Sequence, residues 1–134
     1  MILTIKDDRK ISEVQESFNQ KYPYLKLEFF KKMHGVKELS PLKGIIDPEK
    51  TIGQIRTIHS DGFITVTPKM TVAELEQEFG NLYGLSVQVF RKSGKMWIET
   101  TVTDKWTLEQ QNSEGEALTI DQKPSKPDYS QWED

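Results

Sequence analysis

Residues 2–32, ILTIKDDRKISEVQESFNQKYPYLKLEFFKK, and residues 63–92, FITVTPKMTVAELEQEFGNLYGLSVQVFRK, decide the fold because they carry one pattern twice. With an offset of 61 residues the apolar positions of the two stretches coincide, so that Phe18 aligns with Phe79. One residue is dropped near Pro23, and an offset of 60 then continues the match. Self-similarity of this kind indicates an internal repeat. The sequence therefore predicts that the chain is built by duplication.

Each copy predicts a short strand, a helix and a second strand. The β-branched runs at 2–5 and 63–67 favour strands. Apolar residues spaced by three and four positions then predict one buried helix face, and they are Ile11, Val14, Phe18 and Tyr22 in the first copy and Val72, Leu75, Phe79 and Tyr83 in the second. Thr71 and Glu74 form a capping box for the second helix, and Gly84 ends it. Alternation predicts second strands with one buried face, formed by Leu25, Leu27 and Phe29 and by Leu85, Val87 and Val89.

The two copies are predicted to share one core. Neither is large enough to bury its helix face alone, so we expect a single α+β domain over residues 1–120, with repeats at about 1–56 and 62–112. The duplicated β-α-β(-β) units would form one mixed sheet with two helices on one face, in a ferredoxin-like or a β-grasp-like arrangement. A hairpin turn at Gly94 would add a final strand to the second copy. Capping boxes at Thr51–Gln54 and Thr107–Gln110 predict short helical turns. Residues 121–134 are predicted to form a disordered acidic tail.

The composition excludes several classes of protein. The 134 residues include no cysteine, which excludes a disulfide framework, a thiolate metal site and a cysteine nucleophile. No apolar run approaches the roughly 20 residues that span a bilayer. The start of the chain, MILTIKDDRK, lacks the basic-then-apolar order of a secretory signal. We therefore expect a cytoplasmic protein that does not bind a membrane.

The net charge of the chain comes from its C-terminal end. Residues 1–108 carry 16 Lys and Arg against 14 Asp and Glu, whereas residues 109–134 carry 2 against 7. The nearly neutral body creates no strong field to gather phosphates, which argues against nucleic acid as a partner. The acidic end is typical of a solvating segment. Its aromatic residues, Tyr129 and Trp132, leave docking into a groove as an alternative.

The sequence contains no motif that indicates catalysis or metal binding. Its two histidines, His34 and His59, lack the spacing of a two-histidine metal site. The serines lack a Gly-x-Ser-x-Gly pattern, and the glycines stand singly rather than in a phosphate-binding loop. We therefore assign no catalytic residue, no metal ligand and no cofactor. His59 with Asp61 is the one candidate pair, and an ordinary polar turn before a strand is its simpler explanation.

The most informative feature for function is a basic and aromatic cluster at the ends of both second strands. Aromatic residues adjoin two cations in FFKK and in VFRKSGKMW, and the candidate binding residues are Phe30, Lys31, Lys32, Phe90, Arg91, Lys92, Lys95 and Trp97. Phe30 and Phe90 are expected on the opposite sheet face from Leu27 and Val87, where they would be partly exposed. Such a face can bind a protein or stack single-stranded bases. Packing over the second face of the sheet is the simpler explanation.

These observations favour a non-catalytic protein-interaction module, which would bind another protein or a second copy of this chain through its sheet face or edge. Two alternatives stay open. The first is an enzyme or a small-molecule-binding protein with a pocket between the repeats, near His59 and Asp61. The second is a single-stranded nucleic-acid binder, whose affinity would fall steeply with salt.

Three runs of the chain, ELEQEF at 74–79, LSVQVFRKSG at 85–94 and WTLEQQN at 106–112, resemble a group of small proteins from Bacteroidetes-type bacteria. The resemblance covers about residues 1–120 and leaves out the tail. The group has no assigned activity, so the resemblance implies a cytosolic bacterial protein. It carries over no catalytic or binding residue.

Overall fold

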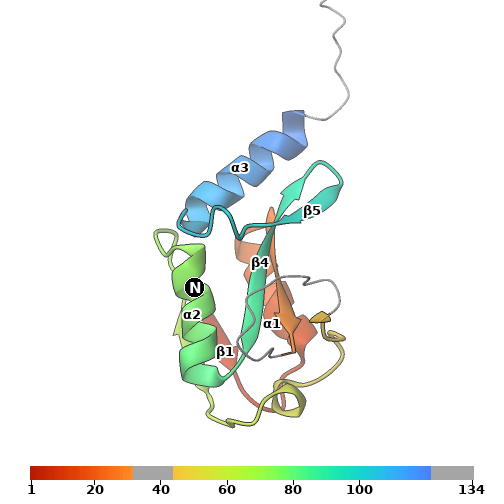
Figure 1. Ribbon diagram of the computed structural model, residues 1–134, viewed down its shortest axis with the longest axis vertical. Helices are drawn as coiled ribbons and strands as arrows, with labels where there is room; N and C mark the ends of the chain where they lie inside the picture. The colour runs from red at the N-terminus through yellow and green to blue at the C-terminus, as the bar shows by residue number, and fades with distance from the viewer. Residues whose placement is uncertain (32–43, 122–134) are drawn as a thin grey trace, which may run out of the picture.

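The computed structural model describes residues 1–31 and 44–121, which form an α+β fold around one core (Figure 1). In chain order its elements are β1 (Ile2–Ile5), α1 (Ile11–Lys21), β2 (Leu25–Phe30), the 3-10 helix η2 (Ile52–Ile55), β3 (Gly62–Thr65), α2 (Val72–Tyr83), β4 (Ser86–Ser93), β5 (Met96–Glu99) and α3 (Leu108–Asp121). The predicted α+β class is confirmed. The predicted tail, apart from Asp121 at the end of α3, lies outside the described residues.

The strands form two separate antiparallel sheets. β1 pairs with β3, and the second sheet has the order β2–β4–β5. The prediction of one mixed sheet is therefore wrong, because β1 and β2 belong to different sheets. Each of them pairs with a strand from the second half of the chain, β1 with β3 and β2 with β4. A sheet with one solvated face is typically antiparallel, and β2 alternates between buried and half-buried residues along its length.

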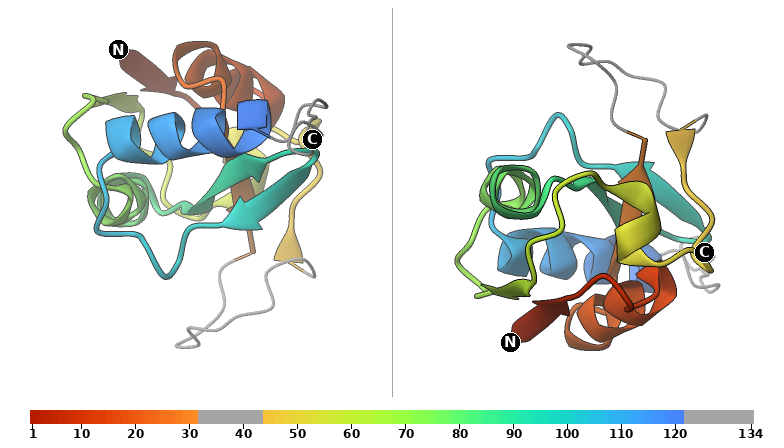
Figure 2. Two further views of the ribbon diagram at one scale, coloured as in Figure 1. Left: turned by 90° about the horizontal axis from the view of Figure 1, so that it is seen from above. Right: turned by 90° about the horizontal axis from the view of Figure 1, so that it is seen from below.

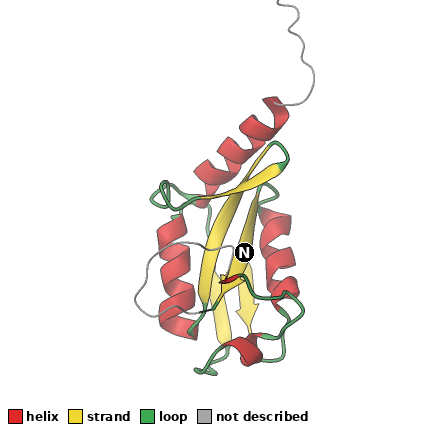
Figure 3. Ribbon diagram, turned by 45° about the vertical axis from the view of Figure 1, so that its right-hand side comes forward, coloured by secondary structure: helices red, strands yellow, loops and turns green. Residues whose placement is uncertain are grey.

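The register of β2 against β4 creates the inner face of the larger sheet. Leu27 lies opposite Val89, and Phe29 lies opposite Val87. Residues that are directly opposite point to the same face, so all four side chains face the helices. α1 and α2 flank the strands (Figure 3), and the rings of Phe29 and Phe79 meet edge to face with their centroids 5.8 Å apart. The predicted apolar faces of both helices are buried as expected.

The predicted capping box at the start of α2 and the predicted glycine positions at its end and in the hairpin turn are also confirmed. The Thr71 hydroxyl accepts a hydrogen bond from Glu74 N at 3.1 Å, and the Glu74 carboxylate accepts one from Thr71 N at 2.9 Å. Gly84, which follows α2, has a φ of 64°, and Gly94 in the β4–β5 turn has the same value. Both positions therefore require the left-handed backbone that glycine adopts at little cost.

Two connecting segments, at 48–53 and 104–109, are anchored to the starts of α1 and α2 by matching backbone hydrogen bonds of 2.8–3.1 Å. Each bond at α1 has a counterpart at α2. From the first bond to its counterpart, the residue next to the helix moves by 61 positions and its partner in the segment moves by 56. The matched pairs, donor first, are Ile11 to Lys50 and Val72 to Trp106, Ser12 to Pro48 and Ala73 to Asp104, Ile52 to Arg9 and Leu108 to Met70, and Gly53 to Asp7 and Glu109 to Pro68.

The sequence predicted only a short helical turn after Thr107, but the structure has the 14-residue helix α3 there. α3 lies on the same side of the larger sheet as α1 (Figure 2) and is held by polar contacts. The fully buried Gln111 donates to Thr103 O at 2.7 Å and accepts from Arg91 Nη1 at 2.8 Å. In the part of the chain that the structure describes, no helix is both long and apolar enough to cross a bilayer.

Gly115 brings α3 into close contact with the sheet, and we expect Gly115→Ala to destabilise the fold. A Cβ atom there would lie 2.8 Å from Cβ of Tyr24 and 3.1 Å from Cγ of Arg91, so α3 would have to shift. Such overpacking costs about 1–3 kcal/mol, which exceeds the gain of about 1 kcal/mol that alanine brings to a helix. Urea unfolding should therefore show a net loss of stability.

The matched control is Gly80→Ala in α2. The nearest atom to a Cβ at Gly80 is Leu85 O at 3.8 Å, so alanine fits without movement. This variant should gain roughly 0.5–1 kcal/mol. Equal gains for both variants would contradict the close packing of α3 at Gly115.

Candidate functional site

The outer face of the β2–β4–β5 sheet gathers four side chains, Lys26, Phe90, Lys92 and Trp97, which we call the lysine–tryptophan face. Lys26 lies opposite Phe90, and Lys92 lies opposite Trp97, so the register places all four on the side away from Leu27. α1 and α3 lie on the other side of the sheet (Figure 2). Among the described residues, no helix covers the lysine–tryptophan face.

Trp97 is the centre of this face. Its ring centroid lies 4.9 Å from Lys26 Nζ and 5.5 Å from Lys92 Nζ, within the range of cation–π attraction. Lys26 also pairs with Glu28 at 3.0 Å, whereas Lys92 forms no ion pair within the described ranges. The face therefore presents a half-buried indole beside one ammonium group that has no carboxylate partner there.

The structure brings together only part of the predicted binding set. Phe90, Lys92 and Trp97 share the lysine–tryptophan face, but Phe90 is buried with 5% of its surface exposed, which corrects the expectation of partial exposure. Lys26 Nζ lies 6.0 Å from the Phe90 ring and helps to cover it. Sequence reasoning missed Lys26, because its place beside Phe90 depends on a strand pairing that the sequence does not show.

The other members of the predicted set lie elsewhere. Arg91 is on the inner face, where it binds Gln111 and lies with its guanidinium carbon 5.6 Å from the Trp106 ring. Phe30 is half-buried at the far end of β2, and Lys31 follows it. Lys95 is exposed in the β4–β5 turn. Lys32 lies outside the described residues.

A second charged cluster surrounds Arg56, whose side chain is fully buried. Arg56 Nη2 and Nε donate to Asp7 Oδ1 at 2.8 and 3.0 Å, and Nη1 donates to Tyr83 O at 3.2 Å. Asp61 Oδ1 lies 3.4 Å from Nη2. The hydrogen bond from Arg56 is the main reason why the pKa of the Asp7 carboxyl lies below its usual value, and His59 lowers it further.

His59 pairs with Asp7 and not with Asp61, the partner that the sequence offered as a candidate. Its Nδ1 lies 2.7 Å from Asp7 Oδ2, whereas Asp61 contacts Arg56 and accepts a hydrogen bond from Asp7 N at 3.3 Å. The candidate pair of His59 with Asp61 is therefore not formed, and Asp61 lies beside the buried guanidinium of Arg56 instead. An aspartate–histidine pair can act as a general base, but no described hydroxyl group is hydrogen-bonded to His59. The cluster is a structural clamp between the β1–α1 loop and the segment before β3.

A cleft of about 320 Å³ lies between α2 and the outer edge of β4. It is lined by Ala73, Glu76, Gln77, Gly80, Leu85, Ser86, Val87 and Asp104. Glu76 Oε2 accepts a hydrogen bond from Val89 N at 3.1 Å. Burial raises the pKa of the Glu76 carboxyl to about 7, with a smaller contribution from Asp104, although the bond from Val89 opposes the shift.

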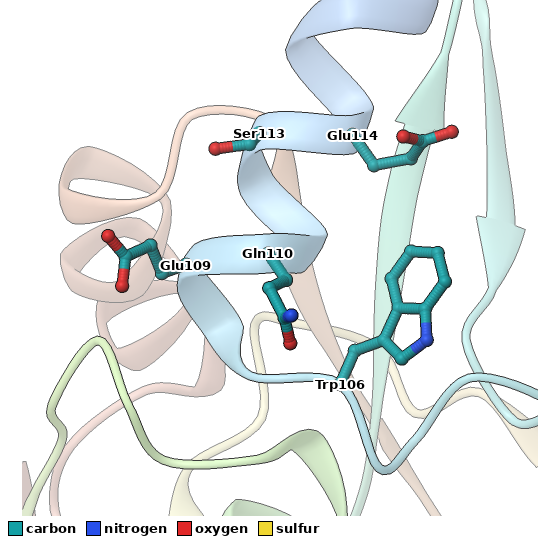
Figure 4. A pocket seen from close by; sticks show the side chains of 5 residues that line it. All are labelled: Trp106, Glu109, Gln110, Ser113 and Glu114. Atoms are coloured by element: carbon teal, nitrogen blue, oxygen red, sulfur yellow. The ribbon is translucent and has the colours of Figure 1, made fainter.

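Two further depressions lie along the helices. One, of about 480 Å³, is lined by Trp106, Glu109, Gln110, Ser113 and Glu114 (Figure 4), and another, of about 590 Å³, follows the exposed side of α2. Neither of these nor the cleft beside Glu76 includes His59 or Asp61. Over residues 1–31 and 44–121, no group of three His, Asp or Glu side chains is placed to hold a metal ion.

We expect Arg56→Ala to destabilise the fold by about 2–3 kcal/mol, because it leaves a buried site without its cation and Tyr83 O without a donor. Partial exposure of Asp7 keeps the loss below that of a fully buried pair. The lowered pKa of Asp7 means that its contribution is present above the ordinary carboxyl pKa and is lost as the pH falls through the lowered value. In the variant, the free energy of unfolding should no longer show this fall at acid pH that comes from Asp7.

The control is Lys10→Ala, which breaks the exposed pair of Lys10 with Glu49 at 3.0 Å. Exposed pairs contribute little to stability, so this variant should lose much less than Arg56→Ala. Urea unfolding between pH 2 and pH 7 measures both effects. Equal losses in the two variants would show that Arg56 has no special role in the fold.

We expect Glu76→Gln to remove a pH dependence of stability near neutrality. The folded pKa of about 7 exceeds the ordinary value of 4.5, so the folded state holds the proton more tightly. The free energy of unfolding should therefore fall as the pH rises from 4.5 to 7, by up to about 3 kcal/mol, and stay low above that. Glutamine still accepts from Val89 N without a charge.

Thermal or urea unfolding at pH 5 and pH 8 tests this expectation. Glu76→Gln should match the unmodified protein at pH 5 and exceed it at pH 8. The control Glu78→Gln, on the same helix, should keep the slope of the unmodified protein. A Glu76→Gln protein with that same slope would contradict the assignment.

Comparison with known proteins adds no relative to this description. No protein-family model, no curated protein and no solved structure matches the chain.

Proposed function

We propose that this chain is a protein-interaction module and that the lysine–tryptophan face is its docking surface. The observation that carries the proposal is the half-buried Trp97 indole between the ammonium groups of Lys26 and Lys92, on a sheet face that no described helix covers. Tryptophan is enriched among the residues that contribute most to protein interfaces, because one ring supplies a large contact area with few rotatable bonds.

The charges on this face favour a protein over a nucleic acid. Glu28 and Glu99 lie on the same side of the sheet as Lys26 and Phe90, and their carboxylates would repel phosphates. Phe90 is too deeply buried to stack with a base. A partner protein that offers a carboxylate to Lys92 and an apolar side chain to Trp97 fits both features of the face.

We also propose that the module arose by duplication of one β-α-β unit. The matching backbone hydrogen bonds to the starts of α1 and α2, offset by 61 and 56 positions, support this proposal. The strand pairs support it too, because the register is symmetric about Leu3 with Ile64 in one sheet and about Glu28 with Gln88 in the other. Ile2 pairs with Thr65 and Thr4 pairs with Phe63, so the residues that correspond in the two repeats occupy equivalent positions on the two strands.

Lys92→Glu should abolish capture of the partner while leaving the fold intact. The reversed charge would repel the carboxylate that Lys92 attracts, and the expected loss of affinity is at least tenfold. The measurement is a nuclease-treated pull-down from the source organism, quantified by mass spectrometry for the unmodified protein and for the variant. Far-UV circular dichroism checks that the variant folds.

The control is Lys69→Glu, which makes the same charge change at an exposed lysine before α2. A protein captured by the unmodified chain and by Lys69→Glu, but not by Lys92→Glu, supports the proposal. Equal capture by all three would remove the lysine–tryptophan face as the docking surface. Recovery of nucleic acid that disappears with nuclease would favour the single-stranded nucleic-acid alternative instead.

A further inference from the structure

One outer edge of the larger sheet is β2. On the other side the first residues of β4 also form an edge, because β5 pairs with β4 only from Phe90 onward. Along β2, the side-chain amide of Asn19 donates to Leu25 O at 2.8 Å, and that of Gln15 donates to Leu27 O at 2.7 Å. Both residues come from α1. α1 therefore satisfies this edge at Leu25 and Leu27 with its own side chains, and Ile46 N satisfies Phe29 O at 2.8 Å.

α2 does not satisfy the edge of β4 in the same way. The residues 61 positions after Gln15 and Asn19 are Glu76 and Gly80. The Glu76 carboxylate accepts from Val89 N instead of capping a carbonyl group, and Gly80 has no side chain. Nothing in α2 among the described residues therefore donates to the edge of β4.

The unsatisfied backbone groups belong to Val87. Val89 turns its backbone to the outer edge, since its carbonyl accepts from Thr100 N at 3.3 Å. Val87, two residues earlier, faces the same edge. β5 pairs with β4 only from Phe90 onward, and no hydrogen bond reaches Val87 across this edge within the described ranges. An unpaired strand edge of this kind is a template for another extended chain.

The space beside Val87 is open. The cleft of about 320 Å³ runs along it between α2 and β4. A Cβ atom at Gly80 would meet nothing nearer than Leu85 O at 3.8 Å, so the cleft is unobstructed there. Beside β2 the corresponding residue is Asn19, whose side chain fills the space next to the strand. Two carboxylates, Glu76 and Asp104, line the cleft, and none of its lining residues is a cation.

We propose that this cleft binds an extended segment of a partner protein as an added strand beside Val87, and that Glu76 and Asp104 select a segment that carries lysine or arginine. Strand addition supplies affinity through backbone hydrogen bonds, while side-chain pockets supply specificity. The bound cation would relieve the repulsion between the two carboxylates. This edge is separate from the lysine–tryptophan face, so the inference does not depend on the function proposed above.

The test is a titration of the ¹⁵N-labelled protein with acetyl-Thr-Lys-Val-Lys-Thr-amide, followed by amide chemical shifts. The expected result is saturable shifts of Val87 and its neighbours in the cleft. The matched peptide acetyl-Thr-Glu-Val-Glu-Thr-amide should bind at least tenfold more weakly, because its carboxylates face Glu76 and Asp104.

Gly80→Asn is the decisive variant. It places in α2 an asparagine equivalent to Asn19 of α1, whose amide caps a carbonyl group of β2. It should weaken binding of the lysine peptide at least tenfold, whereas Gly80→Ala, which leaves the cleft open, should not. Glu76→Gln combined with Asp104→Asn should abolish the preference for the lysine peptide over the glutamate peptide.

Three results would overturn the proposal: no shift of Val87 at millimolar lysine peptide, saturable shifts that map to another surface, or undiminished binding by a folded Gly80→Asn protein. The mapping on the unmodified protein decides the question even if that variant does not fold. If the lysine peptide does not bind but Lys92→Glu still abolishes capture in the pull-down, the cleft is rejected as a binding site and the proposed function is retained.

Discussion

The register of β2 against β4 is the constraint on which the rest of the structure depends. It places Leu27 and Phe29 on one side with Val87 and Val89, so α1 and α2 can bury their apolar faces against a single surface. A slip of one residue would turn the charged residues of β2 towards the helices, because successive side chains alternate between faces. The same register leaves the other side of the sheet to Lys26 and its neighbours, which is why the lysine–tryptophan face exists.

The central pairing also leaves two outer edges that must be satisfied by other means. α1 covers the edge of β2 with Gln15 and Asn19, whereas β5 covers only part of β4. The Glu76 carboxylate accepts a hydrogen bond from the backbone amide of Val89, and its burial there raises the carboxyl pKa to about 7. A glutamine would make the same bond without that cost. The fold therefore does not require a carboxyl group at this position.

The local elements could be predicted from sequence because their signals are local. The spacing of Val72, Leu75 and Phe79, the capping box at Thr71 and the left-handed residue at Gly84 each require only neighbouring positions. The division into two sheets depends on pairing between residues some 60 positions apart, which periodicity does not encode. α3 was missed for a different reason. It docks through a buried glutamine and a close glycine contact rather than through an apolar stripe.

The candidate sites follow the same division. Trp97 and Lys92 stood out because they are adjacent in sequence to other aromatic and basic residues, but Asp7 was invisible as the partner of His59, 52 positions away. If the chain arose by duplication, positions at which the halves agree record what the fold requires. Positions at which they differ are free to serve another purpose. The pairs Gln15 with Glu76 and Asn19 with Gly80 differ in one place, beside a strand edge. There the first half closes the edge of the shared sheet beside β2, and the second half leaves the edge beside Val87 of β4 open.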